Sequence, residues 1–368
     1  MPTRLLLLSL TCLALGPACA PLHPRDATLE ELRALVAARL PQVRAAELVR
    51  PHQVSPAAQA RARELTALAR TRLERAQALR DALFAPAGFG LRYAEGLTAT
   101  AEETLAAGQG NCLSLAAVYV GLARGLALEA TFLDASASLE QTHAAGPVLV
   151  RTGHVTAAVE TETGLLALEF GQRLGARVTF RAMDDLEATA HFYNNRGYEL
   201  MRQARGQADQ AVWEQIARQF RLATLVRPDF ARAWNNLGVA LLRLGRPDEA
   251  LASYRVAAAL EPRFPSPRIN LGIQLLHAGE PEEALRALDE VQRLEPANPR
   301  VWLLRAEALA RLQRLAEAAA LLGQVLEARP GHPRARALLG GVCERAGGSP
   351  PACRLAAGSP GSSQPSPQ

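Results

Sequence analysis

The C-terminal half of the chain repeats with a period of 34 residues, and this period constrains the fold more than any other feature of the sequence. Residues 231–264, 265–298 and 299–332 align with one another. The recurring positions are Trp234 and Trp302, Gly238 and Gly272, Ala250, Ala284 and Ala318, and Pro262, Pro296 and Pro330. Small residues let paired helices approach closely, and proline ends a helix. The period therefore predicts a row of helix pairs.

These recurring residues resemble the tetratricopeptide repeat. An earlier and longer copy begins at Tyr193, and a last partial helix is expected from about Pro333 to Glu344. The resemblance implies an all-α solenoid over residues 191–345, whose concave groove binds peptides or protein partners. Three asparagines near the starts of first helices are candidate groove residues, and the alternative is hydrogen bonding local to each helix start. They are Asn235, Asn236 and Asn270.

Composition favours helices and argues against a nucleic-acid partner. Of the 368 residues, 49% are apolar but only 5% are aromatic, so the cores must be built from Ala, Leu and Val. All 41 basic residues are arginine, and they alternate with acidic residues on helical faces, which leaves a net charge of +5. Nucleic-acid binding needs a concentrated basic patch. No nucleic-acid partner is therefore expected.

Residues 1–19 are expected to be a signal peptide. Arg4 precedes an apolar run over residues 5–15, which is too short to span a bilayer but suits a signal peptide. Two processing patterns stay open, because residues 16–19 resemble a lipobox that would lipidate Cys19, whereas Ala18 to Ala20 also fit ordinary secretory cleavage. The mature protein is expected to be extracytoplasmic, either periplasmic or a lipoprotein that contacts the membrane only through an anchor at Cys19.

The late cysteines fit an oxidising compartment. Cys343 and Cys353 flank a short flexible turn, so a disulfide is expected, the alternative being two separate thiols. Because no second Cys or His pair lies at zinc spacing, neither a metal nor another cofactor is expected. The Gly-, Ser- and Pro-rich tail over residues 346–368 is predicted to be disordered.

Residues 20–84 are predicted to form a helical N-terminal scaffold. Thr28 and Glu31 form a capping box for a first helix, and Ser55 with Pro56 opens a longer second helix that continues to Leu83. No functional role is assigned to these two helices.

One cysteine stands at a chemically suggestive place. A glycine-containing turn over residues 108–111 delivers Cys112 to the first turn of an apolar helix, Leu113 to Leu126, after a short helix over residues 101–107. The N–H groups and the dipole at a helix start stabilise a thiolate, which is the nucleophilic form of cysteine. Cys112 is therefore a candidate nucleophile at the mouth of a buried helix, and the alternative is a small buried apolar residue.

Downstream the pattern changes to strands. Residues 129–133 and 146–150 are candidate strands, and residues 154–160 and 165–170 read as a hairpin. With an even number of loop residues, His154 and Glu169 share one face of adjacent strands. The carboxylate could fix the imidazole tautomer, and the imidazole could deprotonate Cys112. His143, in a polar loop, is the rival base.

Three segments resemble the core of bacterial transglutaminase-like proteins: Thr98–Leu105, Gly110–Cys112 and Leu122–Arg124. The resemblance covers about residues 85 to 185 and implies a papain-like α+β domain over residues 85–190. It assigns Cys112 as nucleophile, His154 as base and Glu169 as the acid. The family usually has aspartate at the last position, and the extra methylene of glutamate moves the carboxylate by about 1.5 Å, which is enough to affect rate.

The whole chain is thus expected to be a transglutaminase-like α+β domain followed by an all-α tetratricopeptide-repeat solenoid, an arrangement that resembles a recurrent bacterial architecture. The resemblance implies thiol-dependent acyl transfer or hydrolysis on peptide or protein amides, with the repeats docking protein partners. The alternative is a catalytically degenerate envelope scaffold that binds proteins through its repeats.

Overall fold

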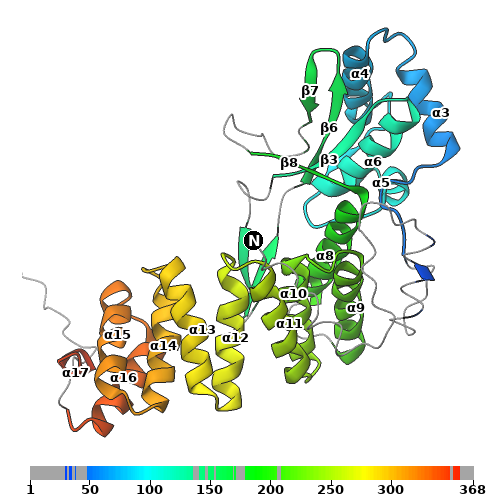
Figure 1. Cartoon of the computed structure of the whole chain (residues 1–368). Coiled ribbons are helices and arrows are strands. Elements are labelled where there is room, and N and C mark those ends of the chain that lie inside the picture. The colour runs from blue at the N-terminus through cyan, green and yellow to red at the C-terminus, as the bar shows by residue number, and fades with distance from the viewer. Residues whose placement is uncertain are drawn as a thin grey trace, which may run out of the picture.

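An α+β unit is followed by a row of antiparallel helix pairs in the computed structural model (Figure 1). It describes residues 48–135, 141–145, 148–152, 155–168, 170, 179–204, 209–348 and 351–356, and a few isolated positions before residue 48. The predicted fold class is confirmed. None of the helices in these ranges is both long and apolar enough to cross a membrane. The predicted signal peptide and most of the predicted disordered tail lie outside the described residues. Within the tail, residues 353–356 form a short helix, so the prediction of disorder is wrong there.

The N-terminal unit is built around a four-stranded antiparallel sheet with the strand order β7-β6-β3-β8. Helix α6 packs on strands β6 and β3 of this sheet. Two smaller sheets accompany it, a parallel β1–β2 pair and an antiparallel β4–β5 hairpin. The elements are α3 (Pro56–Leu65), α4 (Arg72–Phe84), β1 (Arg92–Tyr93), α5 (Ala101–Ala107), β2 (Gln109–Gly110), α6 (Cys112–Gly125), β3 (Ala130–Asp134), β4 (Gln141–Ala145), β5 (Val148–Thr152), β6 (Val155–Thr161), β7 (Gly164–Ala167) and β8 (Arg181–Met183).

Helix α6 is the centre of this unit. Every residue from Cys112 to Ala123 is buried, as its apolar sequence predicts. The chain at His52 crosses the helix at Gly121, where an added Cβ would lie 2.2 Å from the His52 carbonyl oxygen. Only glycine fits this crossing.

The predicted long helix after Ser55 is wrong, because the chain forms two helices there. Ser55 caps α3, which ends at Leu65, and a new helix starts after Thr71. Thr71 and Glu74 form a complete capping box, which satisfies the first N–H groups of α4. The periodic leucines continue across the break and therefore predicted one helix. The cap at Thr71 instead starts a separate helix. The helix expected from Thr28 lies largely outside the described residues.

The predicted β6–β7 hairpin is confirmed, with Glu162 and Thr163 as its two-residue turn. Its register pairs Ala158 with Ala167. The polar loop expected around His143 is wrong, because this residue lies in strand β4, paired with Val150 of β5. The polar sequence of β4 did not predict a strand, but pairing with the apolar strand β5 supplies its backbone hydrogen bonds.

The repeat region forms the predicted helix pairs, and each first helix is followed by its antiparallel partner (Figure 1). The earlier, longer copy is the pair α8–α9, and the last partial helix is α16. The helices are α8 (Asp185–Ala204), α9 (Gln210–Val226), α10 (Ala231–Arg243), α11 (Pro247–Leu260), α12 (Pro265–Ala278), α13 (Pro281–Leu294), α14 (Pro299–Arg311), α15 (Leu315–Ala328), α16 (Pro333–Arg345) and α17 (Cys353–Ala356).

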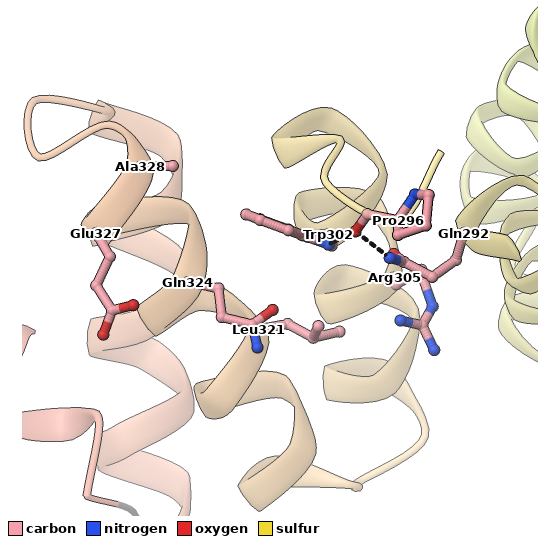
Figure 2. Close-up of a pocket in the computed structure, with 8 residues that line it drawn as sticks. All are labelled: Gln292, Pro296, Trp302, Arg305, Leu321, Gln324, Glu327 and Ala328. Carbon is pink, nitrogen blue, oxygen red and sulfur yellow. Dashed lines mark hydrogen bonds between the residues drawn. The ribbon is translucent and has the colours of Figure 1, made fainter. Parts of the chain in front are cut away.

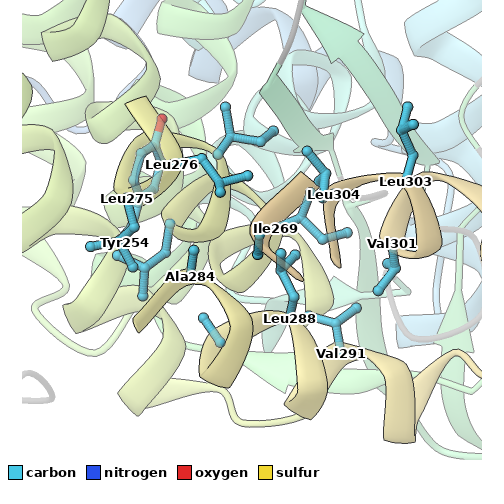
Figure 3. Packing of buried hydrophobic residues seen from close by; sticks show 14 of the residues in the cluster. Tyr254, Ile269, Leu275, Leu276, Ala284, Leu288, Val291, Val301, Leu303 and Leu304 are labelled. Carbon is cyan, nitrogen blue, oxygen red and sulfur yellow. The ribbon is translucent and has the colours of Figure 1, made fainter. Parts of the chain in front are cut away.

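The recurring small residues mark close helix contacts. A Cβ at Gly238 would lie 2.6 Å from the ring of Tyr254, and one at Gly272 would lie 2.8 Å from Leu288. Side chains from successive helices interlock there into one apolar core (Figure 3). The paired helices therefore approach closely because these positions carry no side chain.

The recurring tryptophans have a second role besides packing. The indole N–H of Trp234 donates to the carbonyl of Pro228 at 2.8 Å, and that of Trp302 to Pro296 at 3.0 Å. In the intervening repeat, Arg268 donates to Pro262 at 2.9 Å. In these three repeats, a side chain of the first helix thus donates to the carbonyl of the proline in the preceding loop, although the donor residue changes.

The predicted disulfide is confirmed. Cys343 of α16 is bonded to Cys353 of α17, with the Cα atoms 5.7 Å apart. Helix α17 packs on α15 and α16, so the bridge fastens the end of the array.

Helix α8 belongs to both parts of the molecule. Phe192 and Tyr193 are buried in the core of the N-terminal unit, whereas Met201, near the end of the same helix, is buried in the core of the repeats. The Tyr193 hydroxyl also accepts the backbone N–H of Val49 at 2.8 Å. The join between the two parts is therefore a continuous helix.

Candidate functional site

Cys112 is the first residue of α6, and the turn before it is fixed by side chains. Asn111 caps the helix, and its Oδ1 accepts the Ser114 N–H and the Ser114 hydroxyl, both at 3.0 Å. Gly110 cannot carry a side chain, since a Cβ there would lie 2.7 Å from Cβ of Ser114. Gly108 adopts a left-handed conformation that ends α5. Asn111, Gly110 and Gly108 therefore each have a structural task in placing the thiol.

A carboxylate from the repeat region braces this turn. Glu199 of α8 accepts the Thr98 N–H at 2.7 Å, the Thr98 hydroxyl at 2.6 Å and the Asn111 side-chain amide at 3.1 Å. Asn111 also donates to the Thr98 hydroxyl oxygen at 2.7 Å. Burial raises the pKa of Glu199, while these hydrogen bonds oppose that rise. The first helix of the repeats thus helps to hold the helix start that carries Cys112.

The thiol environment corrects the expectation of a thiolate stabilised by the helix start alone. Cys112 is only 8% exposed. Burial raises the pKa of its thiol, and backbone N–H groups of Val155, Leu113 and Cys112 itself lower it by a smaller amount. The charge of Glu199 adds to the rise. Loss of water around the sulfur therefore outweighs the helix N-terminus among the described groups.

The proposed partners of Cys112 cannot be placed. His154 and Glu169 lie outside the described residues, and the side chain of the rival base, His143, does too. What is described is Val155, the residue after His154, whose N–H interacts with the Cys112 sulfur. The start of β6 is therefore beside the thiol, and the catalytic triad stays a prediction.

Sequence reasoning missed Glu199 and the role of Ser114. Ser114 follows Asn111 at the spacing of a helix cap, so its N–H could have been predicted as the capped group. Glu199 lies in the repeat region, far along the chain from Cys112, and no local pattern connects the two.

A second cluster of ionisable side chains lies where β3, β8 and α8 meet. The possible ligand atoms of Asp134, Glu187 and His191 lie within 4.8 Å of one another, a spacing that a metal ion could use. Arg181, however, donates to Asp134 at 3.1 Å and makes a bidentate pair with Glu187. Arg181 offsets one of the two carboxylate charges, and Arg227, whose Nη1 lies 3.7 Å from Glu187, supplies a second positive charge, so the cluster is explained as an ion-pair network.

A cleft of about 720 Å³ lies among α13, α14 and α15 (Figure 2). It is lined by Gln292, Pro296, Trp302, Arg305, Leu321, Gln324, Glu327 and Ala328. Arg305 is paired with Asp289 at 2.7 Å, and the Trp302 indole is bonded to Pro296. The cleft belongs to the repeats and is remote in sequence from Cys112.

The candidate groove asparagines are buried and bonded to one another across repeats. Asn270 donates to Asn235 at 2.8 Å, Asn235 to Asn236 at 3.2 Å, and Asn236 to Asn194 of α8 at 2.9 Å. Asn235, Asn236 and Asn270 have no exposed surface. These asparagines therefore do not line an open groove, and their hydrogen bonds are not confined to one helix start. Their amides link successive first helices.

Replacing Asn111 by alanine is expected to destabilise the fold by about 1–2 kcal/mol, because α6 loses its cap and Glu199 loses a donor. Urea unfolding followed by circular dichroism measures this loss. Asn298→Ala is the matched control, because Asn298 caps α14 of the repeats in the same way. The control should be destabilised by a similar amount without any change in the alkylation rate of Cys112, whereas an Asn111→Ala chain as stable as the parent would contradict the assignment.

A search of the curated proteins found no match. Among solved structures, MamA from Desulfovibrio magneticus RS-1, residue 41 to its end, is 20% identical over 48% of this chain and 92% of that chain, with a TM-score of 0.41. YrrB, described as a TPR protein with an unusual peptide-binding site, is 20% identical over 45% of this chain and 82% of that chain, with a TM-score of 0.40.

The family comparisons divide the chain in two. Residues 59–165 match the transglutaminase-like superfamily, and this match includes most of α3 and all of α4, ahead of the boundary at residue 85 that the sequence suggested. Residues 194–265 and 275–342 match tetratricopeptide repeats. The chain therefore joins a transglutaminase-like domain to an array of tetratricopeptide repeats.

Proposed function

We propose that the protein is a thiol-dependent enzyme that acts outside the cytoplasm on amide groups of peptides or proteins, by acyl transfer or hydrolysis. Cys112 attacks the amide carbonyl, His154 takes the thiol proton and passes it to the leaving amine, and Glu169 orients the imidazole. Backbone N–H groups at the start of α6 stabilise the oxyanion. The repeats dock the protein substrate or a protein partner.

One observation carries this proposal: the start of β6 meets the start of α6 at the thiol. Helix α6 packs on β6, the Val155 N–H is among the backbone groups that lower the pKa of the Cys112 thiol, and Val155 directly follows His154 in the chain. In the family that the chain resembles, the catalytic cysteine lies at a helix start and the catalytic histidine lies on a strand beside it. The described pairing of β6 with β7 runs from Thr161 and Gly164 to the hydrogen bond from the Leu168 N–H to the Ala157 carbonyl at 2.9 Å.

The proposed location rests on two features. The apolar run before residue 16 suits a leader that ends near Cys19. The Cys343–Cys353 bridge is of a kind that persists in oxidising compartments.

A second candidate function, a protein-binding scaffold without catalysis, is favoured by the burial of Cys112. Burial raises the pKa of the thiol, which lowers its nucleophilic fraction at neutral pH. In this case the repeats carry the function and the transglutaminase-like domain serves as a platform.

The pH dependence of Cys112 alkylation separates the two functions. If His154 accepts the thiol proton of Cys112, the rate of reaction with iodoacetamide should follow an apparent pKa below about 8.5, the value of an ordinary thiol. Mass spectrometry of the full chain locates the label and gives its rate from pH 5 to 10. His154→Ala should shift the profile upward by at least one unit, and Cys112→Ala should abolish the label.

The matched control is His143→Ala, which removes the rival histidine. It should leave the profile unchanged. A parent profile at or above the ordinary thiol value, insensitive to His154→Ala, would exclude the enzyme and leave the scaffold.

A further inference from the structure

The β4–β5 hairpin belongs to the transglutaminase-like domain in sequence but lies against the repeats. It falls between β3 and β6, which are neighbours in the central sheet, yet its two strands pair with each other as a separate sheet. Strand β5 contacts α10 and α12, the first helices of two successive repeats (Figure 1). The chain thus leaves the central sheet after Asp134, reaches the repeats, and returns at Val155.

Burial shows that these two helices are covered. All residues are buried over 235–241 in α10 and over 269–276 in α12, which is about two full turns in each helix. A helix at the surface of a two-layer array keeps one face exposed, so burial over two turns requires a cover on that face. Helix α11, the second helix of the α10 pair, contacts both helices from within the array, and strand β5 contacts both from outside it.

Helix α14, the first helix of the following repeat, shows how buried such a helix is where β5 does not contact it. In α14 the run of buried residues is interrupted by partly exposed side chains at Trp302, Arg305 and Glu307. The contacts of β5 are with α10 and α12. The covered part of the array therefore ends where the hairpin contacts end.

We propose that the β4–β5 hairpin is an internal ligand of the repeat array, and that a protein partner docks on α10 and α12 only by displacing it. The competing partner would present an extended apolar segment, as β5 does with its sequence Val148-Leu149-Val150 followed by Arg151. Because the hairpin is tethered, its effective concentration at the repeats is of the order of millimolar, and it weakens any competing peptide.

Displacement would also reach the candidate active site, a step that rests on the proposed function. Strand β5 ends at Thr152 and β6 begins at Val155, whose N–H interacts with the Cys112 sulfur. A hairpin that leaves the repeats no longer holds the end of β5 in place, and this end is close in the chain to the start of β6. Partner docking and the reactivity of Cys112 are therefore coupled through the hairpin.

Peptide binding tests the docking step. The probe is a fluorescein-labelled synthetic peptide of residues 136–153, and its binding is followed by anisotropy to the full chain and to a variant whose residues 137–151 are replaced by a Gly/Ser linker of equal length. The peptide should bind the variant at least tenfold more tightly than the parent. Equal affinity for the two proteins, or binding to neither, would overturn the proposal.

Hydrogen exchange on the unmodified full chain provides a measurement that does not depend on the folding of the variant. An isolated two-stranded hairpin is at best marginally stable in water. Amides of β4 and β5 that pair with each other should therefore be protected at least a hundredfold relative to the free peptide, because the hairpin rests on the helices. Exchange as fast as in the free peptide would overturn the proposal by itself.

The coupling is tested by the alkylation rate of Cys112 in the linker variant, which should differ at least threefold from the parent at pH 7. An unchanged rate in a variant that binds the peptide would refute the coupling. Failure of the proposed enzyme function gives a different result, because it appears in the parent chain as a pH profile that is insensitive to His154→Ala.

Discussion

Acidification from pH 6.5 to 4 is expected to remove about 3 kcal/mol of folding stability through one buried histidine, His191. The residue is 3% exposed, and its ring stacks on Phe230 with the ring centroids 4.5 Å apart. Burial, with a smaller contribution from the positive charge of Arg232, lowers the pKa of His191 to about 4. Asp134 and Glu187 oppose this shift, and Arg181 supports it.

The sign follows from the lowered pKa. Between the unfolded pKa of about 6.5 and the folded pKa, the unfolded chain binds a proton that the folded chain does not. The contribution is therefore fully present above pH 6.5, is lost as the pH falls, and levels off below pH 4. Carboxylates elsewhere also titrate in this range, so the difference between parent and variant carries the test.

Urea unfolding at several pH values between 7 and 4 measures this contribution. His191→Phe keeps an aromatic ring for Phe230 and should lose less stability than the parent over this range, by about the same 3 kcal/mol. The control is His277→Gln, because His277 is exposed at the end of α12. An acid loss in His191→Phe equal to that of the parent would contradict the prediction.

Replacing Gly121 by alanine is expected to destabilise the transglutaminase-like domain by about 3 kcal/mol, at the upper end of overpacking costs. The new Cβ would lie 2.2 Å from the His52 carbonyl oxygen and 3.0 Å from Val54. The first of these contacts is backbone, which cannot rotate away. The His52 side chain is also paired with Asp185 of α8 at 3.4 Å, so a shift of this segment weakens its contact with the joining helix.

Thermal unfolding followed by circular dichroism checks this prediction. The matched control is Gly340→Ala, because Gly340 also lies within a helix, α16, but no described atom lies within 4 Å of its added Cβ. Alanine there should stabilise the repeats by about 0.5–1 kcal/mol, since it reduces the freedom of the unfolded chain. A similar loss of stability in both variants would show that the Gly121 contact is not the cause.

The repeat array was predictable from the sequence because several recurring residues indicate the same helix pairs independently. Gly238, Gly272 and the prolines 34 residues apart each indicate the same helix pairs, so an error at one position does not change the answer. The cap of α6 at Asn111 could have been predicted in the same way, because a cap acts within four residues of itself, and the Thr100–Glu103 capping box before α5 follows the same rule.

The thiol environment was not predictable from the sequence around Cys112. The helix start indicates a lowered pKa, but burial depends on what packs over the turn, and part of that packing comes from α8, whose Glu199 lies far along the chain. The contact of β5 with the repeats was hidden for the same reason. It depends on two domains lying beside each other, and no periodic pattern within either one describes their interface.

The continuous helix α8 also limits how such a protein can diversify. Domains joined by a flexible linker can be exchanged as modules, because neither loses core residues when the chain is cut between them. Here Phe192 and Tyr193 fill one core while Met201 fills the other, and Glu199 braces the turn before Cys112. A recombination that exchanged the repeat array at residue 191 would remove side chains that the neighbouring domain needs. The first helix of the array must therefore be inherited with the transglutaminase-like domain, together with the parts of α9 and α10 whose Leu222, Ala223 and Ala233 lie in the same core.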